Sequence, residues 1–252
     1  MKLVVTAGRL KSPITLSLLY WLYANGYDVK KIVCCLPINI KRLRFILRNR
    51  LRKKAFKIHR AQEDILTQAL PIPQQGKMKF LIWLIARLKI ARDINSFSVV
   101  KEIKAADLVI YTGGGIIKGE ALKENCTPII NTHLGLLPAV RGMNAVEWSI
   151  LLNEPIASTV HLIKAGIDTG PVLSEKKIQI QPVSNLSELR GQALISGLEH
   201  LKHTIEGIKS LPIKRSLEQE NSNEKSMQCY SLSATLVDLI EDRLNNDYYS
   251  FY

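Results

Sequence analysis

The stretch INTHLGLLPAVRG, residues Ile130–Gly142, places two polar side chains, Asn131 and His133, at the end of an apolar run. The run that precedes them, Pro128–Ile130, has the character of a buried strand. Side chains two apart in a strand point to the same face, so Asn131 and His133 are predicted to face the same way. The Gly-Leu-Leu-Pro sequence that follows predicts a turn. Polar groups at the end of a buried strand usually face a cleft, which makes this stretch the first candidate for a functional site.

Upstream of this stretch, strand-like and helix-like segments alternate. The predicted strands are KLVVTA (2–7), DVKKIVCCLP (28–37), ADLVIYTGGG (106–115) and TPIINTH (127–133), and the predicted helices are SPITLSLLYWLYANG (12–26) and FLIWLIARLKIARDI (80–94). This alternation predicts an α/β fold with a Rossmann-like, mostly parallel sheet flanked by helices. Ligands of such sheets bind beyond the carboxyl ends of the strands. Asn131 and His133 lie at one such end, and Gly113–Gly115 at another.

Downstream of Gly142 the pattern changes. It predicts a helix over MNAVEWSILLNE (143–154), a short antiparallel extension of two strands over IASTVHLIKAGIDTGPVLSEKKIQI (156–180), a helix over 184–208 capped by Ser184 or Asn185, and a last amphipathic helix over SLSATLVDLIEDRLNN (231–246). The polar composition between about Leu211 and Gln228 indicates a linker or an exposed loop. We therefore predict a main domain over residues 1–211, and a linker with a small C-terminal helical tail over residues 212–252.

The chain is strongly basic, with 35 Lys and Arg against 22 Asp and Glu, a net charge of +13. The excess is concentrated in residues 41–57, which hold nine basic residues and no acid. Leu43, Leu47 and Leu51 recur there at helical spacing, as in an amphipathic helix. Such a segment suits an anionic partner, namely nucleic acid, a phosphorylated substrate or a membrane surface. The alternative is a solvated basic helix with no specific partner. The sequence does not predict an oligomeric state.

Neither a metal site nor a membrane span is predicted. The four cysteines, at positions 34, 35, 126 and 229, match no zinc pattern or disulfide framework, which indicates core thiols in a reducing, cytoplasmic setting. His59, His200 and His203 are expected to be surface or helix residues without metal-ligand spacing. No apolar run reaches the roughly 18 to 20 residues that a transmembrane helix needs.

A third polar residue completes a plausible reaction centre. Asp168 lies in GIDTGP, a loop between two predicted strands, where Gly166 and Gly170 permit tight bends. An amide, an imidazole and a carboxylate together suit acyl transfer, because the amide of Asn131 can stabilise an oxyanion and the imidazole of His133 can move a proton. No serine or cysteine stands in a nucleophile-like context, which favours direct transfer. The alternative is a hydrogen-bonded structural pair.

The motifs NTHLGLLPAVRG and STVHLIKAGIDTGPVL resemble those of the folate-dependent formyltransferase family. That family includes glycinamide ribonucleotide, methionyl-tRNA and sugar N-formyltransferases. Its pattern is Asn-x-His-x-x-Leu-Leu-Pro, a Gly a few residues later, then a strand and an Asp-x-Gly loop. The matching residues are Asn131, His133, Leu136, Leu137, Pro138, Gly142, Asp168 and Gly170. The resemblance is specific over Asp107–Ile180 and extends by topology over Met1–Leu211.

The resemblance implies 10-formyltetrahydrofolate as the formyl donor and an amine as the acceptor. It implies that Asn131 and His133 stabilise a tetrahedral intermediate and shuttle its proton, and that Asp168 tunes His133 and orders water. It also implies that the pterin contacts backbone groups in two segments. These cofactor-binding residues are Gly115, Ile116, Ile117 and Lys118 in the first segment, and Ala165, Gly166 and Ile167 in the second.

The chain departs from the family pattern in two places that bear on the acceptor. AGRLKSP, after the first strand, lacks the paired Gly-Ser loop expected of purine-pathway members, although Arg9 and Lys11 are available for a phosphate. About 40 residues follow Leu211, too few for the C-terminal barrel of tRNA-directed members. The favoured acceptor is a small, nucleotide-linked amino sugar, with Arg141 and His161 as further substrate-side candidates.

Three alternatives to this acceptor stay open. The basic segment 41–57 keeps a methionyl-tRNA formyltransferase-like function under consideration, because neutralising phosphates drives the binding of nucleic acids. The same three polar residues suit a formyltetrahydrofolate hydrolase with water as the acceptor. The last alternative is a non-catalytic relative that binds RNA or another anion, with a silent site.

Overall fold

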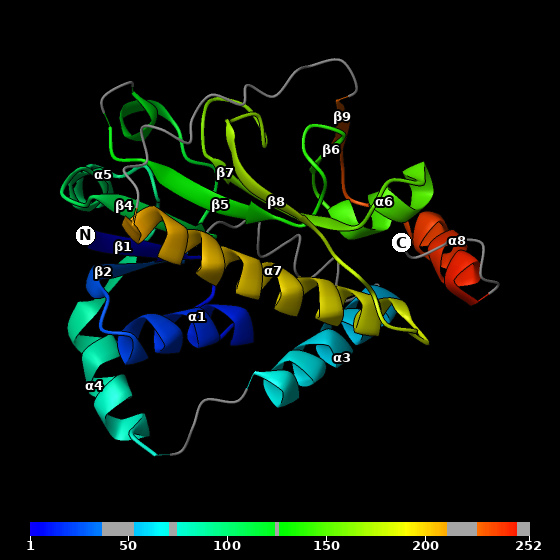
Figure 1. Cartoon of the computed structure of the whole chain (residues 1–252), viewed down its shortest axis with the longest axis horizontal. Helices are drawn as coiled ribbons and strands as arrows, with labels where there is room; N and C mark the ends of the chain where they lie inside the picture. The colour runs from blue at the N-terminus through cyan, green and yellow to red at the C-terminus, as the bar shows by residue number, and fades with distance from the viewer. Residues whose placement is uncertain (37–52, 71–74, 124–125, 211–225, 246–252) are drawn as a thin grey trace. The chain divides into compact units, whose positions relative to one another are not determined.

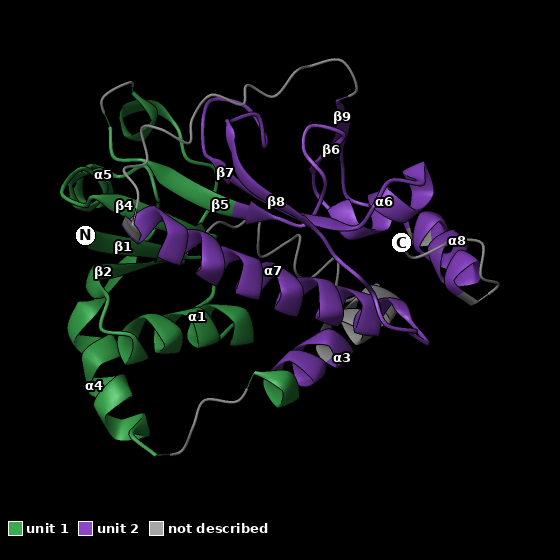
Figure 2. Cartoon of the chain, in the orientation of Figure 1, with its two compact units in different colours: residues 1–52, 67–131 green, residues 53–66, 132–252 purple. Residues whose placement is uncertain are grey.

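The computed structural model describes residues 1–36, 53–70, 75–123, 126–210 and 226–245 (Figure 1). Most of the basic segment 41–57, including the predicted Leu43, Leu47 and Leu51 stripe, lies outside these residues, as does most of the predicted linker. The chain divides into two compact units, one of residues 1–52 and 67–131 and the other of residues 53–66 and 132–252 (Figure 2).

The first half of the chain alternates between strands and helices as predicted. Its elements are β1 (Lys2–Ala7), α1 (Pro13–Ala24), β2 (Asp28–Cys35), α3 (Lys53–Ala69), α4 (Lys77–Arg87), β3 (Leu88–Ala91), α5 (Phe97–Lys104), β4 (Leu108–Thr112), the 3-10 turn η1 (Gly119–Leu122) and β5 (Ile129–His133). Strands β1 to β5 pair in parallel with one another, in the pairs β1–β2, β1–β4, β2–β3 and β4–β5. The seven-stranded sheet has the order β3-β2-β1-β4-β5-β7-β8, whose first five positions match a Rossmann-type sheet. The predicted fold class is confirmed.

The strand β3 was not predicted, and the helix expected over residues 80–94 ends at Arg87. At Leu88 the backbone turns extended (φ −70°, ψ 130°), and Leu88–Ala91 pairs with Ile32–Cys35 of β2. The Arg87 guanidinium fixes this transition, because its Nε donates to the carbonyl of Val29 at 2.8 Å. The residues Leu88–Ala91 continue the helical sequence pattern, but they form a strand because they pair with β2.

The two glycine turns at the carboxyl edge of the first unit touch each other. A Cβ atom on Gly8, after β1, would lie 3.1 Å from the backbone nitrogen of Gly114, and one on Gly113 would lie 3.1 Å from that of Gly8. The strand order reverses between β1 and β4, which is where open α/β sheets bind ligands. Glycine is needed here because the two backbones approach too closely for side chains.

The second half of the chain forms the other unit. Its elements are β6 (Val140–Gly142), α6 (Ala145–Leu152), β7 (Ala157–Leu162), β8 (Val172–Lys177), α7 (Leu186–Ser210), β9 (Met227–Cys229) and α8 (Ala234–Asn245). The pair β7 and β8 is antiparallel and forms the predicted extension. Helix α7 is capped by Asn185, whose Oδ1 accepts the N–H of Glu188 at 3.0 Å, while Glu188 accepts the N–H of Ser184 at 2.8 Å. The side-chain cap from Asn185, with Glu188 accepting the N–H of the residue before it, explains where α7 begins.

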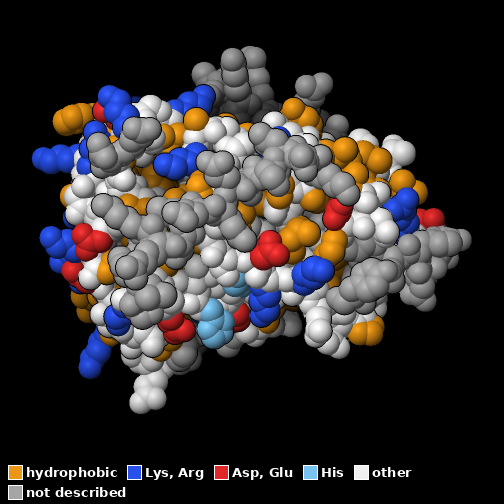
Figure 3. Space-filling view, turned by 45° about the horizontal axis from the view of Figure 1, so that its top comes forward, with side chains coloured by type: hydrophobic (Ala, Val, Ile, Leu, Met, Phe, Trp, Pro, Cys, Tyr) orange, Lys and Arg blue, Asp and Glu red, His pale blue; other side chains and the backbone are white. Residues whose placement is uncertain are grey.

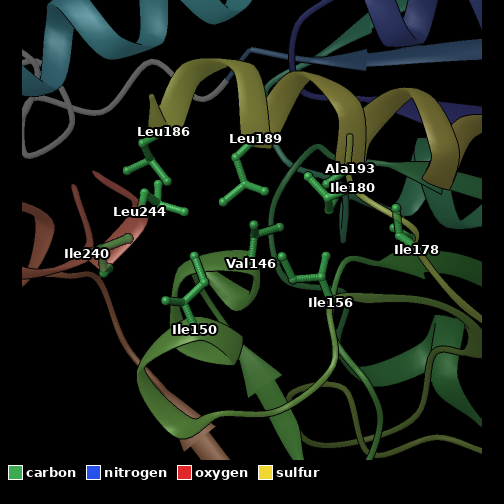
Figure 4. Close-up of a cluster of buried hydrophobic side chains, with 10 residues drawn as sticks. All are labelled: Val146, Ile150, Ile156, Ile178, Ile180, Leu186, Leu189, Ala193, Ile240 and Leu244. Atoms are coloured by element: carbon green, nitrogen blue, oxygen red, sulfur yellow. The ribbon is translucent and has the colours of Figure 1, made fainter. Parts of the chain in front are cut away.

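Helices α6, α7 and α8 share a buried core. Figure 4 shows Val146 and Ile150 of α6, Leu186, Leu189 and Ala193 of α7 and Ile240 and Leu244 of α8 among the clustered side chains. Beside this core, Glu147 is only 2% exposed and forms an ion pair with Arg190 of α7. The C-terminal helix is therefore packed into the same unit as His133 and Asp168.

A small two-stranded sheet was also missed. The strand β6 follows the Leu-Leu-Pro turn and pairs in parallel with β9 from the C-terminal segment. Each strand has only three residues, too short for an alternating pattern to be recognised. A Cβ on Gly142 would collide with the carbonyl oxygen of Cys229, which explains why the closely approaching strand ends in glycine.

All four cysteines are free thiols. Cys34, Cys35 and Cys229 are buried, as expected of core thiols, whereas Cys126 is partly exposed. Burial raises the pKa of Cys35 to about 11, and the neighbouring Cys34 and Asp93 add to this shift. Among the described residues, no helix is both long and apolar enough to cross a bilayer.

We expect Leu189→Ala to lower the free energy of unfolding by about 2 to 5 kcal/mol, because Leu189 is fully buried among three helices. Urea unfolding followed by circular dichroism measures this loss. The matched control is Leu239→Ala on α8, where the leucine is 44% exposed and the change should stay within about 0.5 kcal/mol. Equal effects of the two variants would contradict the assignment of this core.

Candidate active site

Strand β5 carries both polar residues of the opening stretch. Asn131 pairs in register with Tyr111 of β4 and is half-buried. His133, two residues later on the same strand, is 7% exposed. Because they are separated by two positions in one strand, their side chains project from the same face, as predicted.

The His133 ring is held by the strand that follows the turn. Its Nε2 lies 2.7 Å from the carbonyl oxygen of Val140. A carbonyl only accepts hydrogen bonds, so Nε2 carries the proton and Nδ1 is the basic ring nitrogen of neutral His133. Gly135 makes this contact possible, since a Cβ there would lie 2.7 Å from His133 Nε2 and 2.8 Å from the Val140 oxygen.

Asp168 lies between two histidines. Its Oδ2 is 3.5 Å from Nδ1 of His133, and its Oδ1 is 3.5 Å from Nε2 of His161. Oδ2 also accepts the backbone N–H of Gly142 at 2.9 Å. The Asp168 backbone is left-handed (φ 52°), which aspartate tolerates better than most residues. This conformation delivers the carboxylate to the end of β5.

The environment sets the charges of this pair. Burial lowers the pKa of His133, and His161 adds to this, while the Asp168 carboxylate and the Val140 carbonyl oppose the shift without cancelling it. Burial raises the pKa of Asp168, but its interactions with His161, His133 and the Gly142 N–H outweigh burial and leave that pKa below its usual range. At neutral pH the site therefore holds a neutral imidazole beside a carboxylate.

Thr159, a residue that the sequence did not single out, fixes the turn between β5 and β6. Its hydroxyl donates to the carbonyl of Gly135 at 2.7 Å, and its oxygen faces the N–H of Leu137 at 3.3 Å. The Leu137–Pro138 peptide in this turn is cis. The signal that could have found Thr159 is its position two residues before His161 on β7, a fully buried strand whose alternate side chains share a face.

The substrate-side candidates occupy different surroundings. His161 is only 2% exposed, and its Nδ1 lies 2.9 Å from the carbonyl of Leu162, so it faces Asp168 from within β7. Arg141 is half-buried; one guanidinium nitrogen donates to the Ile167 carbonyl at 3.4 Å, and its buried Nε has no hydrogen-bond partner among the described atoms. Arg9 and Lys11 are exposed in the loop after β1.

The first segment predicted to contact a cofactor, Gly115–Lys118, follows β4 in the first unit. Tyr111 donates its hydroxyl to the carbonyl of Gly115 at 2.8 Å. Asn95 clamps the next residues, because its amide donates to the Ile116 carbonyl at 2.9 Å and its oxygen accepts the Lys118 N–H at 2.7 Å. The backbone of this segment is thus held in one shape, with Ile116 60% exposed and Ile117 buried.

The second segment predicted to contact a cofactor, Ala165–Ile167, belongs to the other unit and leads into Asp168. The Ala165 carbonyl accepts the hydroxyl of Thr169 at 2.8 Å. Gly166 has a φ of 105°, and a Cβ there would lie 2.6 Å from the Thr169 oxygen. The loop is therefore a tight turn in which glycine is required.

His200 was expected to be a surface or helix residue. It lies in α7, but it is only 6% exposed, so the surface alternative is wrong. Its Nδ1 is hydrogen-bonded to the hydroxyl of Ser158 of β7 at 2.9 Å, and its Nε2 to the hydroxyl of Ser174 of β8 at 2.8 Å. These two hydrogen bonds permit the burial of the ring. His203 is exposed, and the side chain of His59 lies outside the described residues. Within the described part of the chain, no group of three or more His, Cys, Asp or Glu could hold a metal ion.

Similarity to known proteins agrees with this geometry. The family model described as "Formyl transferase" matches residues 58–203, more than half of the chain and the part that contains Asn131, His133 and Asp168. This chain belongs to the formyl transferase family.

Relatives within the family differ in their named substrates. Methionyl-tRNA formyltransferase from Clostridium botulinum is 30% identical over 154 residues, which are 61% of this chain and 46% of the relative. The chain spans about half the length of the curated relatives it matches. A sugar N-formyltransferase from a Shewanella species has a similar fold, with a TM-score of 0.59 at 18% identity, covering 97% of this chain and 87% of that one. WlaRD, a sugar 3N-formyltransferase solved in the presence of dTDP and 5-N-formyl-THF, has a TM-score of 0.56 at 17% identity, covering 98% and 81%.

We predict that the free energy of unfolding falls as the pH drops from 7 to about 5.5. The pKa of folded His133 lies below its ordinary value of about 6.5, so the unfolded chain binds more protons in this range and stability is lost as the pH falls. His133→Gln removes this titration, and its slope should be shallower by up to about 1.4 kcal/mol per pH unit.

Urea unfolding at several pH values measures both slopes. Burial also lowers the pKa of His200, but this group is present in both proteins and cancels in the difference. A variant slope equal to or steeper than the parent slope would show that His133 is not held neutral by the fold.

Proposed function

We propose that this protein transfers a formyl group from 10-formyltetrahydrofolate to a primary amine by direct attack. The observation that carries the proposal is the placement of Asp168 Oδ2 3.5 Å from the basic Nδ1 of His133, two residues along the strand from Asn131. An amide donor, a neutral imidazole and an ionised carboxylate are the groups that acyl transfer to an amine requires.

Each residue has a separate role in this proposal. The amide of Asn131 donates a hydrogen bond to the oxyanion that develops as the amine attacks the formyl carbon. His133 accepts the proton that the attacking amine loses and returns it to the departing nitrogen. Its depressed pKa keeps the imidazole unprotonated, and therefore able to act as a base, at neutral pH. Asp168 stabilises the imidazolium that forms, because its carboxylate faces Nδ1.

The cofactor segments have the chemistry that a pterin ring needs. A pterin presents alternating hydrogen-bond donors and acceptors at its edge, which backbone N–H and C=O groups can match. The clamps on Gly115–Lys118 by Tyr111 and Asn95 would keep such groups in place before the folate binds. Bound 10-formyltetrahydrofolate would supply the activated formyl group. Gly115, Ile116, Ile117 and Lys118, together with Ala165, Gly166 and Ile167, are the residues proposed to hold it.

For the acceptor we favour an amino sugar linked to a nucleotide. The similarity in fold to sugar N-formyltransferases over almost the whole chain supports this choice. Arg9, Lys11 and Arg141 supply positive charge suited to a diphosphate, with Arg141 joined to the Asp168 loop through the Ile167 carbonyl.

Methionyl-tRNA is the second candidate acceptor. The curated relative from Clostridium botulinum supports it, and so does the basic composition of residues 41–57. A panel of dTDP- and UDP-linked amino sugars and charged initiator tRNA, each incubated with radiolabelled 10-formyltetrahydrofolate, separates the two acceptors. A blank without acceptor measures hydrolysis to formate. Turnover in the blank alone would assign water as the acceptor.

We expect His133→Ala and Asn131→Ala each to reduce kcat/KM for formyl transfer by about 100- to 10,000-fold. Asp168→Asn should reduce it as well, because the carboxylate that stabilises the imidazolium is lost. His203→Ala, at a histidine whose side chain is 76% exposed, is the matched control and should stay within about twofold of the parent. Rates within about threefold of the parent for the His133 variant would overturn the catalytic assignment.

A further inference from the structure

We infer that the C-terminal strand β9 positions the catalytic pair by holding β6 from its far edge. One edge of β6 serves the site: the Val140 carbonyl accepts from His133 Nε2 at 2.7 Å, and the Gly142 N–H donates to Asp168 Oδ2 at 2.9 Å. These two residues are two apart, so their backbone groups point the same way in a strand. This inference rests on the proposed function of His133 and Asp168.

The opposite edge of the same segment is bonded to the C-terminal strand. The Met227 N–H donates to the Ala139 carbonyl at 3.1 Å, and the Met143 N–H donates to the Cys229 carbonyl at 3.1 Å. Arg141 lies in register with Gln228 between these bonds. The backbone around β6 is therefore held from both sides, by the catalytic side chains on one and by β9 on the other.

Two side-chain contacts anchor β9 against this unit. The indole N–H of Trp148, on α6, donates to the carbonyl of Tyr230 at 2.8 Å. Cys229 is 3% exposed and packs with Val140 and Ala145. A pair of three-residue strands is only marginally stable by itself, so these anchors are what keep β6 in place.

Loss of β9 would affect two catalytic contacts together. The Val140 carbonyl sets the protonated nitrogen of His133, and the Gly142 N–H orients Asp168. Displacements of about 1 Å in such a site can reduce rates about 100-fold. We assign β9 a positioning role, since its residues act through β6.

The test compares Met227→Pro with Met227→Ala. Both remove the same side chain, which is 46% exposed, but only proline removes the N–H that bonds to Ala139. We expect Met227→Pro to reduce kcat at least tenfold with the KM for 10-formyltetrahydrofolate within about twofold. Met227→Ala should retain kcat within about twofold of the parent.

A second readout does not depend on activity. Proton NMR detects the His133 Nε2 hydrogen, assigned by its absence in His133→Gln, and its exchange with water should be slow in the parent and in Met227→Ala. We expect at least tenfold faster exchange in Met227→Pro. If the parent shows no formyl transfer, the proposed function fails, while the exchange rates still test the positioning role.

Equal kcat and equal exchange in the two Met227 variants would overturn the inference. Should Met227→Pro fail to fold, Trp148→Phe removes the indole donor to Tyr230 and keeps an aromatic ring, although a smaller one, beside Val140, Ala145 and Cys229. Trp148→Phe should also decrease kcat and speed up the exchange of the His133 Nε2 hydrogen, but by smaller factors than Met227→Pro. Parent-like values of both in Trp148→Phe would count against the role of β9.

A different observation, on the first unit, carries a second inference. Helix α4 packs Phe80 and Leu84 inward, with the Phe80 and Trp83 rings 5.6 and 5.4 Å from the Tyr23 ring of α1. Its outer face, at helical spacing, exposes Met78, Ile82 and Ile85 by 68%, 62% and 67%. An apolar stripe this exposed is typical of a binding surface. We infer that this face of α4 rests on an anionic lipid surface.

Charge decides between a lipid surface and a second copy of the chain. The helix sequence KMKFLIWLIAR contains no acid, and the exposed Lys77 and Lys79 flank the apolar stripe. Long lysine side chains can reach lipid headgroups while apolar neighbours enter the interface. Two copies meeting through α4 would bring like charges together, and each chain carries +13. The face of the chain drawn in Figure 3 carries Lys and Arg side chains with Asp and Glu side chains among them.

Vesicle flotation tests this second inference. The parent should bind vesicles of phosphatidylcholine with phosphatidylserine, and bind phosphatidylcholine alone at least tenfold more weakly. Ile85→Glu should weaken binding to the anionic vesicles at least tenfold. The control Leu239→Glu makes the same change of charge on α8, at a leucine that is 44% exposed, and should bind within about twofold of the parent.

Two results would overturn the lipid assignment. If both glutamate variants bind like the parent, or if the parent does not bind, α4 is not a membrane contact. If sedimentation shows a parent dimer that Ile85→Glu dissociates, without vesicle binding, the face joins two copies of the chain.

Discussion

The hydrogen bond from the Gly142 N–H to the Asp168 carboxylate is the contact on which the rest of the candidate site depends. It joins the end of the Leu-Leu-Pro motif to the loop between β7 and β8, two segments separated by 26 residues. With this bond in place, Asp168 faces both His133 and His161. Its left-handed backbone leaves few other ways to reach the same position.

Burial and the Asp168 charge have opposite effects on the pKa of His133, and their balance decides whether the imidazole is protonated. Removing His133 from water disfavours its charged form, whereas Asp168 favours it. The result is a neutral ring beside a negative partner, which gains a proton only when a reaction supplies one. A more exposed histidine would be partly protonated at neutral pH, and one without the carboxylate would hold a gained proton weakly.

The sequence predicted the parts of this fold that depend on local pattern. Strands β1, β2, β4 and β5 and helices α1, α6 and α7 follow from apolar runs, caps and glycines close to one another in the chain. Strand β3 was missed because Leu88–Ala91 continues a helical pattern and becomes a strand only by pairing with β2. Strands β6 and β9 were missed because three residues carry no period, and their partner lies far away in the sequence.

The site could likewise be predicted only where it depends on a local sequence motif. Asn131, His133 and Asp168 could be named because their motif is specific, but the carbonyl of Val140 and the amide of Gly142 could not. Both contacts are made by backbone groups, so the identities of Val140 and Gly142 do not reveal them, although Gly142 belongs to the motif. The burial of His200, which was correctly expected in a helix as one of two alternatives, could not be predicted for a related reason: the hydroxyls that allow it come from Ser158 and Ser174, on other strands.

The pairing of β6 with β9 also affects the order in which parts of the protein fold during synthesis. Trp148 and the Tyr230 carbonyl that it contacts are 82 residues apart, and the intervening chain includes β7, β8 and α7. A chain leaving the ribosome presents the Asn-x-His motif long before it presents β9, and contacts between distant residues form late because they must close a long loop. The central sheet and the hairpin of β7 and β8 can therefore assemble while β6 still has an open edge. If β9 positions β6 as we infer, the site acquires its final geometry only after β9 has been synthesised, and a nascent chain that ends before β9 would contain Asn131, His133 and Asp168 without ordering them.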